Sequence, residues 1–77
     1  MNNYFEIESF CKNMRNLREA NNLSKKEMAH KLNVSVATIS KIENGTIPPR
    51  LSYIIIVDIY NEFGIIPSQM LNELQNF

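Results

Sequence analysis

The fold of this chain is decided by the stretch LSKKEMAHKLNVSVATISKIENG, residues 23–45. Ser24 and Glu27 have the spacing of a capping box, in which the Ser hydroxyl and the Glu carboxylate each accept a hydrogen bond from the other residue's backbone amide. This pattern predicts a helix that starts after Ser24 and ends at Asn33, a residue type that adopts positive φ at little cost. Ser35 is a second N-cap, so the next helix begins at once. Two helices joined by so short a turn must cross steeply.

The apolar residues of these two helices define the faces that we expect to be buried. They recur at the helical period of three and four residues: Met28, Ala29 and Leu32 in the first helix, and Ile39 and Ile42 in the second. Ala29 is small, as a steep crossing requires where the two backbones approach. Gly45 is expected to close the second helix as a left-handed cap.

Three further helices are predicted around this pair. The first ends near Asn21-Asn22 and starts at Ile7, or at Asn3 if Asn3 and Glu6 form a capping pair. Two prolines make residues 46–50 a loop. A helix then runs from residue 51 or 52 to Phe63, and a fifth begins with Pro67 in its first turn. The chain therefore predicts an all-α fold of five helices in a single domain spanning residues 1–77.

The charge of the chain is segregated along the sequence. Its formal net charge is zero, which alone argues against a nucleic-acid partner. All eight Lys and Arg nevertheless lie between residues 9 and 52 with only three Glu, which gives this span a net charge of +5. The two ends hold five acidic residues and no basic one. This asymmetry favours a nucleic-acid contact by the central span.

Other classes of function find little support in the residues. Cys11 and His30 are each the only residue of their type, and no metal-ligand set, catalytic triad or phosphate-binding Gly loop is present. We expect no enzyme activity, no cofactor and no small-molecule ligand, and we expect Cys11 to be a buried, inert thiol. The apolar stretch 53–57 is far shorter than the roughly 20 residues that span a bilayer. Without a signal-peptide pattern, the expected location is cytoplasmic.

The residues just described resemble the Cro and phage-repressor type of helix-turn-helix domain, also called the Xre family. The matching pieces are Met14-Arg15-x-Leu17-Arg18, the run from Leu23 to Ser35, and Ile39-Ser40-x-Ile42-Glu43-Asn44-Gly45. The resemblance covers residues 10–71 and implies a compact, lambda-repressor-like domain with its helix-turn-helix at residues 24–44. It implies a sequence-specific regulator of transcription, in most cases a repressor, that binds double-stranded DNA.

The outer face of the helix that follows Ser35 is the expected base-reading surface. With Ile39 and Ile42 turned inward, this face presents small or hydrogen-bonding residues that let a helix approach the base edges of the major groove. Val36 and Ala37 can contact a thymine methyl group, and Lys41 can donate to guanine. The predicted base-contacting residues are Ser35, Val36, Ala37, Ser40 and Lys41.

Two further sets of residues follow from the resemblance. The predicted phosphate contacts are Ser24, Lys25, Asn44, Thr46 and Arg50. The family also implies an ion pair between Arg18 and Glu43 that braces the reading helix.

The remaining apolar residues suggest that two copies associate. Regulators of this kind usually bind DNA as two-fold dimers, and the chain holds more apolar surface than a small core can bury. We expect a homodimer through the helix that starts near residue 67, reading half-sites about 34 Å apart. The predicted interface residues are Ile65, Ile66, Met70, Leu74 and Phe77. The alternative is a protein-interaction module on the same scaffold, such as an antitoxin or a phage regulatory partner.

Overall fold

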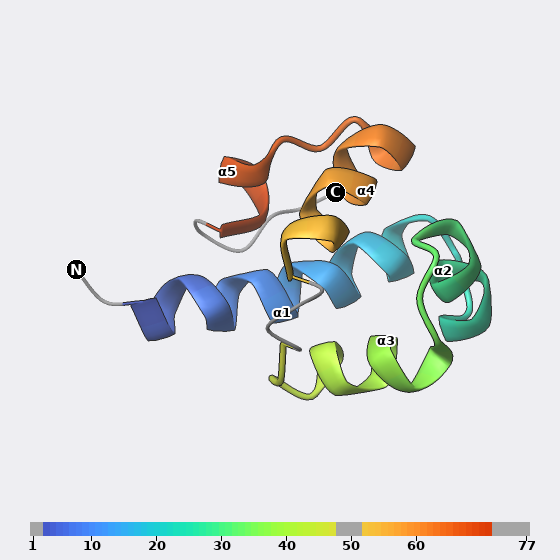
Figure 1. Ribbon diagram of the computed structural model, residues 1–77, viewed down its shortest axis with the longest axis horizontal. Helices are drawn as coiled ribbons and strands as arrows, with labels where there is room; N and C mark the ends of the chain where they lie inside the picture. Colours follow the sequence, from blue (N-terminus) through green and yellow to red (C-terminus); the bar gives the residue numbers. More distant parts are fainter. Residues whose placement is uncertain (1–2, 48–51, 72–77) are drawn as a thin grey trace.

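Five helices make up the part of the chain that the structure describes (Figure 1). The structure is a computed structural model that describes the backbone of residues 3–47 and 52–71 and the side chains of residues 7–47 and 53–71. The helices are α1 (Asn3–Ala20), α2 (Lys25–Lys31), α3 (Val36–Glu43), α4 (Ser52–Phe63) and α5 (Pro67–Leu71). These residues include no strand, so the all-α prediction is confirmed.

The ends of the first three helices are fixed by residues in the left-handed conformation. Asn22, Asn33 and Gly45 have φ angles of 56°, 57° and 100°. Each is followed by a residue whose amide donates to a carbonyl five positions back: Leu23 to Arg18, Val34 to Ala29 and Thr46 to Lys41. This is the hydrogen bond of the Schellman motif, which satisfies carbonyls that the helix itself leaves free. The three predicted helix ends are therefore confirmed.

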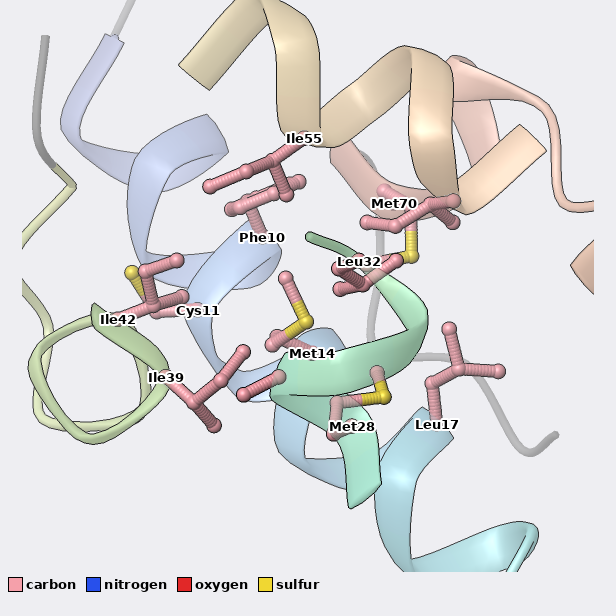
Figure 2. Packing of buried hydrophobic residues seen from close by; sticks show 12 residues of the cluster. Phe10, Cys11, Met14, Leu17, Met28, Leu32, Ile39, Ile42, Ile55 and Met70 are labelled. Carbon is pink, nitrogen blue, oxygen red and sulfur yellow. The ribbon is translucent and has the colours of Figure 1, made fainter. Parts of the chain in front are cut away.

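The core forms between α1 and the other four helices. Figure 1 shows α1 running through the middle, with α3 on one side and α4 and α5 on the other. The buried apolar side chains form one cluster and are turned toward one another in Figure 2. They are Phe10, Cys11, Met14 and Leu17 of α1, Met28 and Ala29 of α2, Leu32 after it, Ile39 and Ile42 of α3, Ile55 and Ile59 of α4, and Met70 of α5.

Two small residues in this cluster behave as the sequence predicted. Ala29 is only 3% exposed and belongs to α2, which packs closely on α3. Cys11 is also 3% exposed, and burial raises the pKa of its thiol. A buried thiol with a raised pKa is a poor nucleophile, so Cys11 fills space in the core.

A polar side chain on α1 holds α5 in place. Asn13 is fully buried, and its side-chain amide donates to the backbone carbonyls of Met70 at 3.0 Å and Gln69 at 3.3 Å. These carbonyls belong to a helix of only five residues, which has few intrahelical partners to offer them. The role of Asn13 was not predicted from the sequence, although Asn13 lies three residues after Phe10 and four before Leu17, in register with the buried face of α1.

The burial of Met70 corrects the predicted dimer surface. Its side chain is 0% exposed within the chain's own core, because Asn13 draws α5 onto α1. Met70 therefore cannot contact a partner, and the prediction for it was wrong. Ile65 is half-buried against the same cluster, while Ile66 is 46% exposed. Leu74 and Phe77 lie outside the described residues.

Candidate nucleic-acid interface

The outer face of α3 is open to solvent along its whole length. Ser35, Val36, Ala37 and Lys41 are exposed and Ser40 is half-exposed, whereas Ile39 and Ile42 on the opposite face are fully buried. Val36, the first residue of α3, is apolar and yet 43% exposed to solvent. The structure thus brings the five predicted base-contacting residues together on one exposed surface.

Ser35 has a structural task as well. Its hydroxyl accepts a hydrogen bond from the backbone amide of Thr38 at 3.1 Å and lies 2.9 Å from the Thr38 hydroxyl. These bonds are those of an N-cap, which typically stabilises a helix by about 1 kcal/mol. Ser35 therefore fixes where α3 begins, and with it the positions of Val36 and Ala37 in the first turn of the helix.

The start of α2 lies beside the outer face of α3. Ser24 and Glu27 form the predicted capping box: the Ser24 hydroxyl accepts from the Glu27 amide at 3.0 Å, and the Glu27 carboxylate accepts from the Ser24 amide at 2.8 Å. The next residue, Lys25, places its ammonium group 3.5 Å from the hydroxyl of Ser40. A residue predicted to contact phosphate thus adjoins one predicted to contact bases.

The other predicted phosphate contacts follow α3 in the sequence. Asn44 caps the helix, and Asn44 and Thr46 are both exposed. Arg50, the remaining predicted phosphate contact, lies outside the described residues.

The lysines of α2 and α3 differ in their ion pairing from the basic side chains of α1. On α1, Lys12 pairs with Glu8 at 3.1 Å and Arg15 with Glu19 at 3.3 Å. By contrast, the four lysines of α2 and α3 are exposed and form no ion pair with any carboxylate in the described part of the chain: Lys25, Lys26, Lys31 and Lys41. These two groups of basic residues were not distinguished from the sequence, because both contribute equally to the count of charges. Unpaired lysines remain free to neutralise phosphates.

An ion pair ties α1 to the end of α3. The Arg18 guanidinium donates two hydrogen bonds to the Glu43 carboxylate, at 2.6 Å and 3.1 Å, and a third to the carbonyl of Leu23 at 2.9 Å. The Glu43 side chain is 4% exposed and that of Arg18 is 13% exposed. The hydrogen bond to Glu43 raises the pKa of Arg18 above its ordinary value. The two bonds to Glu43 fix α3 relative to α1, and the bond to Leu23 ties Arg18 to the turn that precedes α2.

The capping box makes the start of α2 sensitive to acid. Hydrogen bonds from Ser24, first from its backbone amide, lower the pKa of Glu27 below its ordinary value of 4.5. A carboxyl group whose pKa falls on folding contributes stability above its unfolded pKa, and this contribution is lost as the pH falls through the folded pKa. We therefore expect a Glu27→Gln variant to be less stable than the parent at neutral pH and to approach it on acidification. Chemical unfolding of both proteins between pH 7 and pH 3 measures this difference, and a constant gap would contradict the prediction.

Within the described ranges, the structure shows no sign of two other kinds of site. No three His, Cys, Asp or Glu side chains gather as they would around a metal ion. No helix there is both long and apolar enough to cross a membrane.

Comparison with known protein families gives one match. A family model described as helix-turn-helix matches residues 14–58, which is more than half of the chain and includes α2, α3 and the turn between them. Searches of curated proteins and of solved structures found no match.

Proposed function

We propose that this chain, which belongs to the Cro and phage-repressor type of helix-turn-helix family, is a sequence-specific repressor of transcription that reads the major groove of double-stranded DNA with α3. Family membership makes it a DNA-binding regulator. The residues that read the sequence, the two-fold operator and the repressor role are our proposals.

One observation carries the proposal: the outer face of α3 combines small and apolar residues with unpaired lysines around it. Solvated helix faces are usually rich in charged and polar residues. The side chains of Val36 and Ala37 are apolar and form no hydrogen bonds with water, so they are unusual on such a face. Val36 and Ala37 are suited to contact with the methyl group of thymine, which lies on the floor of the major groove. Lys41 lies one turn beyond Ala37 and can donate to the O6 and N7 acceptors of guanine. Ser35 and Ser40 complete this surface with hydroxyl groups.

Phosphate contacts would flank this surface on both sides. A Ser24 hydroxyl that accepts from an amide keeps its own hydrogen for a phosphate oxygen. Lys25 supplies a charge beside it, while Asn44, Thr46 and Arg50 would bind the backbone beyond the other end of α3. Such contacts set the register of α3 in the groove and supply most of the affinity.

Two copies are needed to read an operator with enough specificity. A single small domain covers only a few base pairs, and a two-fold dimer doubles the contact area. The longest dimension of the molecule is 34 Å and the next is 24 Å. Two adjacent copies of this size are thus comparable in spacing with the half-sites, roughly 34 Å apart, that we propose for the operator. Occupation of such a site would exclude other proteins from it, which is how the proposed repression would act.

The test is selection of bound sequences from a random pool of duplex DNA by the full chain. We expect an enriched motif with two-fold symmetry, and a bound fraction that falls steeply between about 50 and 200 mM salt. A pool without any enriched motif would overturn the proposal. Binding only to another protein, with no salt-dependent affinity for DNA, would favour the alternative of an interaction module.

A further inference from the structure

The outer face of α4 is an apolar stripe that no part of the described chain covers. Five exposed residues make up this α4 stripe: Tyr53, Ile54, Val57, Tyr60 and Asn61. The exposed fractions of its four large apolar side chains are 76% for Tyr53, 50% for Ile54, 38% for Val57 and 53% for Tyr60. The acidic residues of the helix, Asp58 and Glu62, occupy other positions, so the stripe carries no charge.

The opposite side of the same helix is already buried. Ile55 and Ile59 are 0% exposed in the core, and Ile56 and Phe63 pack partly against it. α4 is thus apolar on two sides, only one of which is buried, and an exposed apolar patch usually marks an interaction site. The α4 stripe is therefore a surface that we expect something other than the described residues to cover.

The spacing of the stripe is symmetric about Val57. Ile54 and Tyr60 lie three residues before and after Val57, and Tyr53 and Asn61 lie four residues before and after it. In two antiparallel helices related by a two-fold axis at Val57, each residue meets the one at the mirrored position. Ile54 then packs against Tyr60 of the other copy, and the Tyr53 hydroxyl reaches the Asn61 amide. The stripe is thus complementary to itself, as a two-fold interface requires.

We propose that a second copy of this chain covers the α4 stripe, through an antiparallel pair of α4 helices centred on Val57. Antiparallel helices oppose their dipoles favourably, and no charged side chain of the stripe is buried by the pairing. The inference rests on the proposed function in that a two-fold operator calls for two copies. It moves the interface from the helix that starts near residue 67 to α4, and it leaves α3 uncovered because α3 lies on the other side of α1 (Figure 1).

The α4 stripe is small for an interface between two proteins. The two tyrosines supply most of the area, since a tyrosine buries roughly 150–250 Å² when it is fully covered. A stripe of two half-exposed aliphatic residues and two tyrosines remains below the roughly 800 Å² per partner of a standard interface. In the absence of DNA we therefore expect a dimer at the small, weak end of protein–protein interfaces.

Sedimentation equilibrium of the full chain, without DNA, tests the surface. The average mass of the parent should rise from monomer toward dimer with concentration, and Val57→Lys should weaken association at least tenfold. The matched control is Ser68→Lys, which adds the same charge at an exposed position of α5 and should leave association unchanged. Association that resists Val57→Lys, or that Ser68→Lys abolishes instead, would overturn the proposal, as would a monomer at every concentration.

Cysteine crosslinking tests the antiparallel register. In a background with Cys11→Ala and with oxidised glutathione as oxidant, Val57→Cys should form a disulfide-linked dimer much faster than Glu62→Cys, which lies off the stripe. A mixture of Tyr53→Cys and Asn61→Cys proteins should form the mixed dimer in preference to either self-linked dimer. Preferred self-linkage of both would show a parallel pair and refute the register.

Binding to a duplex with one half-site separates this inference from the proposed function. Val57→Lys should keep the parent's affinity for a single half-site taken from the selected motif, because α3 is untouched. If the chain associates through α4 but binds no DNA, the inference stands and the proposed function fails. If it binds a half-site but never associates, the proposed function stands and the inference fails.

Discussion

A Glu43→Ala variant should lose about 3–5 kcal/mol of the free energy of unfolding, the usual cost of removing one partner of a buried ion pair. The reason is the state of the residue left behind. The Arg18 side chain is only 13% exposed, so without Glu43 its charge would remain largely buried with the Leu23 carbonyl and the more distant Glu19 as its partners. Single domains are stable by only about 5–15 kcal/mol. The variant should therefore be partly unfolded near physiological temperature, which thermal and urea unfolding would reveal.

The same loss should reach the DNA-binding surface. Glu43 is the last residue of α3 and Arg18 belongs to α1, so the pair fixes the reading helix to the helix at the centre of the fold. Folded Glu43→Ala protein should bind DNA more weakly than its folded fraction accounts for, because α3 is less firmly oriented. Measurement of affinity at a temperature where the variant remains folded separates this effect from instability.

Two comparisons make the Glu43 prediction specific. Arg15→Ala removes a pair whose side chains are 60% and 56% exposed, and such a pair contributes at most about 1 kcal/mol. A double variant, Arg18→Met with Glu43→Leu, removes both charges and should be clearly more stable than Glu43→Ala, because no charge is left buried alone. Equal losses in Glu43→Ala and Arg15→Ala would show that burial of the pair has no energetic weight.

Local signals in the sequence predicted most of the helix boundaries. Ser24, Ser35 and the left-handed positions Asn33 and Gly45 each act within one turn of backbone, so their effect depends on neighbours a few residues away. The buried faces of α2 and α3 followed from periodicity for the same reason. These features place the exposed face of α3, and hence the candidate site, without reference to distant residues.

The features that sequence analysis missed depend on contacts between distant segments. Asn13 acts on α5 across more than fifty residues, and no local pattern indicates where its amide donates. The burial of Met70 follows from the same contact. The α4 stripe was hidden for a different reason. The helical spacing of Ile55, Ile56, Ile59 and Phe63 indicates the side of α4 that meets the core, but the sequence does not indicate whether another part of the chain covers Tyr53 and Val57 on the other side. Only the packing of α4 in the fold decides this.

The second large effect is expected on DNA affinity, from the removal of Lys41, one of the unpaired lysines of α2 and α3. Lys41→Ala should weaken binding to the selected operator by about 1–3 kcal/mol for each half-site, the contribution of a good contact between a side chain and a base. Because a dimer carries the change twice, the loss on a complete operator should reach roughly 2–6 kcal/mol. Lys41 is exposed on α3, so the free energy of unfolding should change by less than about 0.5 kcal/mol. Titration of labelled operator with parent and variant gives both affinities.

Specificity distinguishes a base contact of Lys41 from a phosphate contact. If Lys41 donates to a guanine, the alanine variant should tolerate any base at that one position while the parent rejects the other three. The matched control is Lys12→Ala, which removes a lysine of α1 that is paired with Glu8 and should leave both affinity and base preference nearly unchanged. A uniform loss across all operator variants, with a shallower salt dependence, would assign Lys41 to the DNA backbone. Recognition of the DNA sequence would then depend on Val36 and Ala37, whose apolar contacts favour thymine.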